Sequence, residues 1–349
     1  MNLKEFPHKR YNPLTDEWVL VSPHRTNRPW QGKLEETSFD NRPSYDPDCY
    51  LCPGNERAGG IRNPVYKSTF VFKNDFAALL DAGSLNFYED GLLKVQEEKG
   101  ICKVLCFSPN HSLTIPEMEV DDLVSVVQVW QQEFELLSNE SFIKNVQIFE
   151  NKGAIMGCSN PHPHGQIWAQ SSVPNEIQKR SITQNIYYNE KGRSILSDYL
   201  EYEIRNETRI ICLNEYFVCL VPFWAVWPYE TMIIPRRHFQ AITDMTEAEV
   251  QAFASILLDI TARYDNLFHT SFPYSAGIQQ RPTENAYHSG WHFHYSFYPP
   301  LLRSATVKKF MVGYEMFANT QRDITAEQVA DTLRSLSPVH YKKHQTEIS

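Results

Sequence analysis

The segment His162-Pro-His-Gly-Gln166 places two imidazoles and an amide at every second position of the chain. In an extended strand alternate side chains face the same side, so His162, His164 and Gln166 are predicted to line one surface. Such a surface can bind a metal ion, or it can bind and attack a phosphate group. The preceding turn, Gly157-Cys-Ser159, offers backbone N–H groups that could hold an anion. The competing interpretation is a histidine pair in an ordinary surface turn.

A second motif, Cys49-Tyr-Leu-Cys52, provides two thiolates at a spacing that can chelate one zinc ion from a tight turn. Turn-forming Asp-Pro-Asp and Pro-Gly flank it. A structural zinc site needs two further ligands, and because no second C-x-x-C occurs they must be histidines or a lone cysteine. A redox pair is one alternative, although Pro-Gly directly after the motif disfavours the helix that it needs. Unliganded loop thiols are the other.

Three other short segments carry polar residues that could contact a ligand. Arg25 and Arg28 form a basic loop that suits a phosphate, or is simply solvated. Asn74-Asp75 follows a predicted strand and could hold a ribose or a base, or form an ordinary turn. His111 is by itself more typical of a capped surface histidine than of a ligand. Neither a P-loop nor a dinucleotide-binding glycine motif occurs, which excludes those two nucleotide sites.

An α+β fold is predicted to position these residues. Apolar residues at helical spacing predict helices over about 121–137 and 246–268 and a third from 325, the last two opening with capping boxes. Between them, runs rich in β-branched and aromatic residues predict strands at 70–73, 102–107, 146–150, 166–168, 217–221, 231–234 and 292–297. Runs of strands with few helices between them predict a mostly antiparallel sheet with helices on one face.

The order of these signals repeats. In each half a strand ends near a histidine, a helix follows, and an H-x-H strand closes the unit. The histidines lie 51 residues apart in the first half (His111 to His162) and 54 apart in the second (His238 to His292). This predicts an internal duplication. The halves are expected to be 1–185, with most of the chemistry, and 198–349, joined by a polar linker around 185–197.

Composition restricts the class of protein. The chain has 349 residues, 42% hydrophobic and 21% charged, which is ample for a folded core. Its net charge of −9 argues against nucleic acid or an anionic membrane as the main partner. No apolar run is long enough to span a bilayer. Seven cysteines in a chain without a recognisable export signal predict reduced thiols and a cytoplasmic location.

Long segments of the chain resemble the galactose-1-phosphate uridylyltransferase family of the histidine-triad superfamily. The resemblance runs nearly end to end, and it is most specific in five segments: 21–25, 46–52, 149–153, 157–168 and 298–316. It implies a duplicated histidine-triad unit on an open, mostly antiparallel half-barrel sheet. It also implies a homodimer in which some substrate contacts cross the interface.

The resemblance assigns roles residue by residue. It implies that His164 is the nucleophile, that Gln166 steadies the transferred phosphoryl group, and that Cys49, Cys52, His111 and His162 bind one structural zinc ion. The positions that match the family's sugar-nucleotide contacts are Arg25, Arg28, Asn74, Asp75, Asn151, Gly157, Cys158, Ser159, Gln166, Lys309, Phe310, Tyr314, Glu315 and Gln321.

The implied reaction transfers UMP from UDP-glucose to galactose 1-phosphate through a covalent uridylyl-His164, with ping-pong kinetics. The runner-up is a nucleoside-diphosphate-sugar phosphorylase that uses the same histidine, and the positions around 309–321 count against it. A non-catalytic, zinc-stabilised binding protein is a third hypothesis, and an intact His164 and Gln166 count against that.

One feature departs from the family pattern. Many members carry a second metal site made of one Glu and three His, and the matching positions here read Arg180, Gln279, His294 and Ser296. An arginine cannot ligate a metal and repels a dication, and Gln and Ser are weak ligands. We therefore expect no second metal, with the nearby His288 and His292 as the main route to an alternative ligand set.

Overall fold

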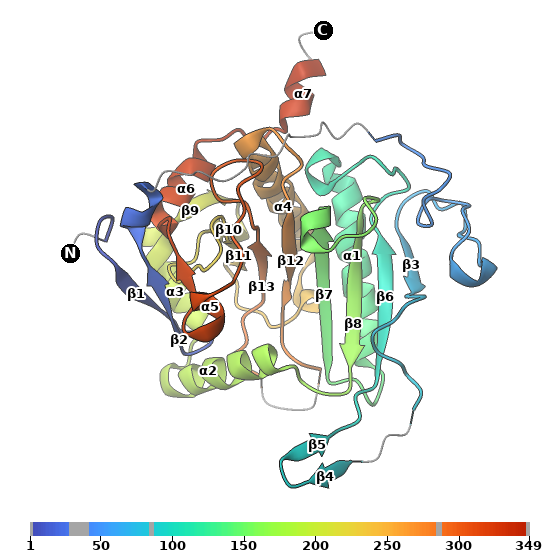
Figure 1. Ribbon diagram of the computed structural model, residues 1–349, viewed down its shortest axis with the longest axis horizontal. Helices are drawn as coiled ribbons and strands as arrows, with labels where there is room; N and C mark the ends of the chain where they lie inside the picture. The colour runs from blue at the N-terminus through green and yellow to red at the C-terminus, as the bar shows by residue number, and fades with distance from the viewer. Residues whose placement is uncertain (1–2, 28–41, 84–86, 284–287, 347–349) are drawn as a thin grey trace.

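A nine-stranded sheet forms the centre of the computed structural model, which describes residues 3–27, 42–83, 87–283 and 288–346 (Figure 1). Every neighbouring pair of its strands is antiparallel. In spatial order the strands are β3 (Phe70–Lys73), β6 (Gly100–Cys106), β8 (His164–Gln170), β7 (Asn145–Lys152), β12 (Tyr274–Gln279), β13 (His294–Tyr298), β11 (Thr231–Pro235), β10 (Phe217–Leu220) and β9 (Ile210–Leu213).

The duplication is visible in this order. From the outside inward, β3-β6-β8-β7 of the first half matches β10-β11-β13-β12 of the second. The two units meet where β7 pairs with β12. Each unit carries one long helix, α1 (Val120–Ser138) or α4 (Glu247–Phe268), in the connection that precedes its innermost strand. The predicted α+β fold with a duplicated, mostly antiparallel sheet is therefore confirmed.

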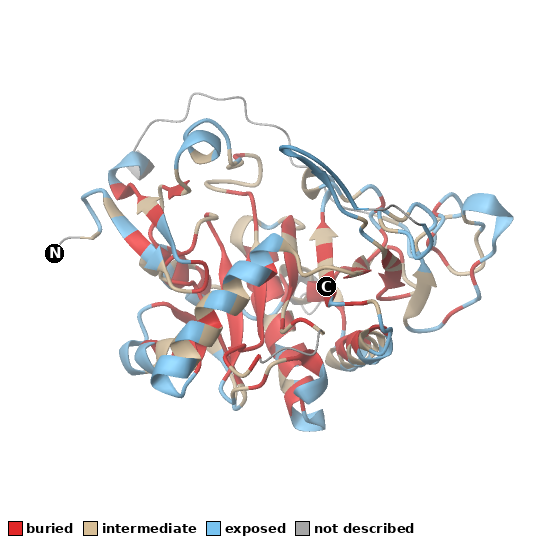
Figure 2. Cartoon of the chain, turned by 90° about the horizontal axis from the view of Figure 1, so that it is seen from below, coloured by how far each residue is buried: buried red, intermediate tan, exposed pale blue. Residues whose placement is uncertain are grey.

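Helices α1 and α4 cover one face of the sheet. Their apolar stripes, including Trp130 and Phe253, join the main hydrophobic core with the inward side chains of the strands. Figure 2 shows this division, with buried residues along the strands and exposed residues on the outer sides of the helices. Both helices were predicted from periodicity, and the capping box of α4 is present between Thr246 and Glu249.

The prediction of helices on one face only is wrong. Helix α3 (Ile195–Asn206) packs Leu196 and Leu200 against β10 and β11 on the opposite face of the second unit. Helix α2 (Asn175–Lys191) precedes it and occupies most of the predicted linker. The segment 185–197 is polar because α2 buries few residues, not because it is an extended connection.

Smaller elements complete the chain. Strands β1 (His8–Asn12), β2 (Glu17–Val21) and β14 (Gln321–Arg322) form a second sheet, and β4 (Tyr88–Asp90) pairs with β5 (Leu93–Val95) in a projecting hairpin. The C-terminal helices are α5 (Tyr314–Phe317), α6 (Ala326–Arg334) and α7 (Tyr341–Thr346). The predicted third helix corresponds to α6, which ends two residues earlier than its last predicted apolar position. Among the helices described, none combines the length and apolar character needed to cross a membrane.

Candidate functional site

Four buried side chains from separate parts of the first unit come together in one cluster. The ligand atoms of Cys49, Cys52, His111 and His162 all lie within 4.8 Å of one another. Cys52 Sγ is 3.6 Å from Nδ1 of each histidine. Within the described part of the chain, this is the one group of three or more Cys, His, Asp or Glu residues arranged to hold a metal ion.

The donor set fits a structural metal. Two thiolates and two imidazoles are a common zinc set, and four protein ligands fill a tetrahedral ion completely. Burial raises the pKa of the Cys52 thiol to about 11, so a cation is needed to stabilise the thiolate. Burial lowers the pKa of His162 to about 4, which keeps its imidazole neutral and able to ligate.

Contacts around the cluster orient its ligands. His162 Nε2 lies 2.8 Å from the Ser108 carbonyl, so this nitrogen donates and Nδ1 keeps its lone pair for the cluster. Asn160 accepts from the His162 backbone N–H at 2.9 Å and donates to Cys49 Sγ at 3.4 Å. Asn160 was not singled out in the sequence, although its place two residues before His162 is a turn signal.

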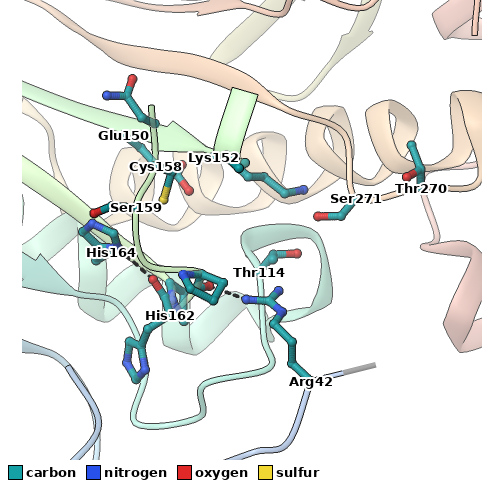
Figure 3. A pocket seen from close by; sticks show the side chains of 15 residues that line it. Arg42, Thr114, Glu150, Lys152, Cys158, Ser159, His162, His164, Thr270 and Ser271 are labelled. Atoms are coloured by element: carbon teal, nitrogen blue, oxygen red, sulfur yellow. Dashed lines mark hydrogen bonds between the residues drawn. The ribbon is translucent and has the colours of Figure 1, made fainter. Parts of the chain in front are cut away.

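His164 begins strand β8 and faces another direction (Figure 3). Its Nδ1 is 2.8 Å from the His162 carbonyl oxygen. A carbonyl only accepts, so Nδ1 carries the proton and Nε2 carries a lone pair. Burial lowers the pKa of His164, which favours this neutral form. The prediction that His162 shares one surface with His164 and Gln166 is wrong for His162, because strand alternation begins only at His164.

Alternation along β8 then proceeds as predicted. His164, Gln166 and Trp168 are partly exposed, whereas Gly165, Ile167 and Ala169 between them are buried. Trp168 Nε1 donates to Gln166 Oε1 at 3.0 Å, which fixes the amide and directs its NH₂ group away from the indole. Trp168 follows Gln166 at the same two-residue spacing, so the sequence pattern also indicated that Trp168 lies on this face.

A cavity of about 480 Å³ opens beside His164. Its lining includes Glu150, Asn151 and Lys152 of β7, Ser159, and Thr270 and Ser271 after α4 (Figure 3). A smaller cavity of about 40 Å³ adjoins it and is lined by His164, Gln166, Asn151 and the 157–159 turn. Gly157 has a φ of 79°, a left-handed conformation that suits glycine.

Residues at the rim of the cavity were not predicted from the sequence. Arg42 donates to the carbonyls of Pro161 and His111, and so ties the 42–49 segment to the histidine loop. Lys152 is buried and pairs with Asp265 at 2.9 Å. Burial raises the pKa of Glu150 to about 7. No local spacing marks these residues, because each contact joins segments far apart in the chain.

The predicted ribose contacts lie at the end of β3. The Asn74 side chain accepts from the Phe76 backbone N–H at 2.9 Å. Asp75 pairs with Arg57 at 2.8 Å, and the Arg57 guanidinium lies over the Phe72 ring at 3.9 Å. Asn151 accepts from Ser275 at 2.6 Å.

The remaining predicted contacts form a separate group near β14. Lys309 pairs with Glu315 and donates to Gln321 at 3.3 Å, and Gln321 donates to Asp323 at 2.6 Å. Arg25 also pairs with Asp323, at 3.3 Å. Phe310 and Tyr314 are about half exposed. Arg28 lies outside the described residues. Within those described, no hydrogen bond or ion pair joins this group to the His164 group.

The second unit repeats the histidine geometry, but among the described residues its histidines are not joined by cysteines in a metal-holding cluster. His292 Nε2 donates to the Pro235 carbonyl at 3.1 Å, and His294 Nδ1 donates to the His292 carbonyl at 2.9 Å. In the first unit, Nδ1 of His162 faces the metal cluster. In the second unit, the corresponding atom, Nδ1 of His292, lies 2.7 Å from the Ser194 hydroxyl.

The matching second metal set does not fit a cation. Arg180 Nε, Gln279 Oε1, His294 Nε2 and Ser296 Oγ are buried polar atoms with no hydrogen-bond partner among the described residues. Burial, and then the charge of Arg180, lower the pKa of His294 to about 3. A positive charge this close opposes a dication, and His288 and His292 do not join His294 in a metal-holding group.

Comparison with known sequences decides the family. Residues 1–174 match the model for the N-terminal domain of galactose-1-phosphate uridyl transferase, and residues 176–345 match that for its C-terminal domain. Galactose-1-phosphate uridylyltransferase of Haemophilus influenzae is 50% identical over 340 residues, with 97% of each chain covered. The enzyme of Saccharomyces cerevisiae is 49% identical over 351 residues, with 96% of each covered. The chain belongs to the galactose-1-phosphate uridylyltransferase family.

Members of this family are nucleotidyltransferases of galactose metabolism, and this chain is one of them. The fold extends to a second activity. A crystal structure of an ADP-glucose phosphorylase from Arabidopsis thaliana with bound ADP-glucose has a TM-score of 0.74, covering 95% of this chain and 99% of that one at 21% identity. The fold by itself therefore does not separate a uridylyltransferase from a phosphorylase.

Proposed function

We propose that this uridylyltransferase transfers UMP from UDP-glucose to galactose 1-phosphate through a covalent uridylyl-His164. The observation that carries the proposal is the contact between His164 Nδ1 and the His162 carbonyl oxygen, which assigns the proton to Nδ1. The His164 Nδ1–H donates to the His162 carbonyl at 2.8 Å, so Nε2 carries the lone pair. Nε2 is therefore the ring atom that can attack a phosphate in the cavity. Partial exposure of His164 allows that meeting.

The reaction balances without an added acid or base. His164 Nε2 attacks the α-phosphorus, an N–P bond forms, and the P–O bond to the β-phosphate breaks with its electron pair leaving on glucose 1-phosphate. The imidazole becomes cationic while its Nδ1–H stays on the His162 carbonyl, which stabilises that charge. A phosphate oxygen of galactose 1-phosphate then attacks phosphorus, the N–P bond breaks, and His164 returns to its neutral form.

The surrounding groups stabilise the transferred phosphoryl group. The Gln166 amide is oriented by Trp168, so its N–H can donate to a phosphoryl oxygen. Backbone N–H groups of the turn 157–159 lie on the same small cavity. Phosphoryl transfer depends mainly on positioning and charge stabilisation, which these neutral donors supply.

Zinc is the metal proposed for the Cys49, Cys52, His111 and His162 set. When bound, the ion would supply a fixed anchor for the two loops rather than an open coordination position. Its effect on catalysis would pass through His162, whose carbonyl holds His164.

The two groups of predicted contacts fit a homodimer. Asn74, Asp75, Asn151 and the turn at 157–159 would bind the nucleotide within one chain. Arg25 and Arg28 belong to the proposed contacts as well. Lys309, Phe310, Tyr314, Glu315 and Gln321 would reach the sugar phosphate in the partner's site, because their group stands apart from His164 in its own chain. We also propose the division into halves 1–185 and 198–349 and a cytoplasmic location.

Incubation with UDP-glucose and no acceptor, followed by intact mass measurement, tests the nucleophile. We expect a gain of one uridylyl group, labile to acid and stable to base as a phosphoramidate is. His164→Ala should form no adduct. The control is His8→Ala, a partly buried histidine of β1 outside the cavity, which should form the adduct normally. An adduct that persists in His164→Ala, or that maps to another residue, would refute the assignment.

The acceptor separates the alternatives. Release of UDP-galactose on addition of galactose 1-phosphate supports the transferase, and release of a nucleoside diphosphate on addition of inorganic phosphate alone would support the phosphorylase. Binding of UDP-glucose without any adduct would support the non-catalytic hypothesis.

A further inference from the structure

The hydroxyl of Tyr66 connects the two parts of the metal cluster. It donates to the Leu51 carbonyl at 2.7 Å, and Leu51 lies inside the turn that carries Cys49 and Cys52. The same oxygen is 3.0 Å from Nε2 of His162. The buried Tyr66 side chain, from the loop before β3, therefore contacts both the Cys49–Cys52 turn and His162, which is distant in sequence.

The proton positions along this path are determined by carbonyl groups. Ser108 O accepts from His162 Nε2–H at 2.8 Å, and Leu51 O accepts the Tyr66 proton. The Tyr66 oxygen is then an acceptor for the same Nε2–H. His162 Nδ1 keeps its lone pair, 3.6 Å from Cys52 Sγ, which is the tautomer that a metal ligand needs.

Packing holds the Tyr66 ring in place. The ring stacks on Phe70 at 5.1 Å between centroids, and Phe70 stacks on Phe72 at 5.3 Å, both in strand β3. Tyr66 is only 9% exposed. The position of the hydroxyl is thus set by the aromatic row and not by the metal.

We propose that Tyr66 is a positioning residue that holds the Cys49–Cys52 turn and His162 together for the metal and, through His162, aims the nucleophile His164. The inference rests on the proposed metal set and nucleophile. The link to His164 is direct, because the His162 carbonyl accepts from His164 Nδ1 at 2.8 Å. Tyr66 is not part of the cavity lining, so it acts on the reaction through another residue.

Tyr66→Phe removes the hydroxyl and keeps the ring. We expect the zinc dissociation constant, measured by competition with a chelator in the absence of substrates, to rise by about 10–100-fold. We expect kcat to fall while KM for UDP-glucose stays unchanged, because the nucleotide contacts are elsewhere. Tyr264→Phe is the matched control, since it removes a buried hydroxyl that donates to the Tyr229 carbonyl at 2.7 Å in the second unit.

Equal zinc affinity in Tyr66→Phe and Tyr264→Phe would overturn the proposal. If zinc binding is weakened in Tyr66→Phe but the unchanged protein itself forms no uridylyl adduct, the role of Tyr66 at the metal is supported and its link to His164 is overturned. If Tyr66→Phe does not fold, the cobalt-substituted unchanged protein gives a second readout. The paramagnetically shifted Nε2 proton of His162 should exchange slowly with water, because two acceptors hold it, and a rapidly exchanging proton would count against the proposal.

Discussion

Glu327 joins three segments that are far apart in the chain. Its carboxylate, at the start of α6, accepts from Arg10 of β1 through two bonds of 2.9 Å and from Arg209, next to β9, through a third of 2.9 Å. Arg10 is buried, and its guanidinium also lies over the Phe223 ring at 4.4 Å. This carboxylate therefore anchors the small sheet that carries Gln321.

The pKa of Glu327 gives the size of the effect. Burial by itself would raise this pKa, but the hydrogen bonds and charge of Arg10, with help from Arg209, lower it from 4.5 to about 2. At about 1.4 kcal/mol per pKa unit, the ionised form stabilises the fold by about 3 kcal/mol. Because the folded pKa lies below the unfolded one, this contribution is complete above about pH 4.5 and is lost as the pH falls toward 2.

Glu327→Gln is therefore expected to lower the free energy of unfolding at pH 7 by about 3 kcal/mol. Urea unfolding at a series of pH values checks this, and the difference from the unchanged protein should shrink below pH 4.5. Glu201→Gln is the control, because Glu201 forms an exposed pair with Arg193 and should cost less than about 1 kcal/mol. A loss below 1 kcal/mol for Glu327→Gln, or one that does not change with pH, would refute the reasoning.

Three further predictions concern the site. Cys52→Ser should lose bound metal and thermal stability together, because binding energy contributes to folding; a full zinc equivalent in that variant, by metal analysis, would contradict the ligand set. Gly165→Ala should cost about 1–3 kcal/mol and reduce kcat, because a Cβ there would lie 2.9 Å from the Phe107 ring; unchanged unfolding and turnover would contradict this. Metal counting should give one equivalent per chain, and a second ion in an anomalous map at His294, beside Arg180, would show that expectation wrong.

The long helices and seven of the nine strands of the main sheet could be predicted from local pattern, whereas β9 and the central strand β12 were not predicted. Helices α1 and α4 have continuous apolar stripes, and the strands between them have β-rich composition. Helix α2 gave no such signal, because it buries only Ile177 and Gln184 and exposes Ile182 and Ile186. Strands β1, β2 and β14 were also missed. Strands β1 and β2 pair as a short local hairpin, and the pairing of β14 with β2 joins the two ends of the chain.

The candidate site divides in the same way. Alternation along β8 is a local property, so the common face of His164 and Gln166 followed from spacing. The second pair of proposed metal ligands, His111 and His162, followed from the family resemblance and not from any local rule. Contacts such as that of Tyr66 depend on how a long loop folds back, which no short pattern encodes.

The contact between Ser194 and His292 bears on how the two units came to differ. Ser194 meets His292 Nδ1 at 2.7 Å, and the carbonyl contacts of the H-x-H segment are otherwise those of the first unit. The H-x-H strand geometry therefore does not depend on the presence of a metal cluster. One copy holds the histidine arrangement as buried scaffolding supported by a hydroxyl, while the other carries the proposed nucleophile and the cluster that could hold an ion. After a duplication, each copy could exchange this one supporting group without rebuilding the sheet that both share.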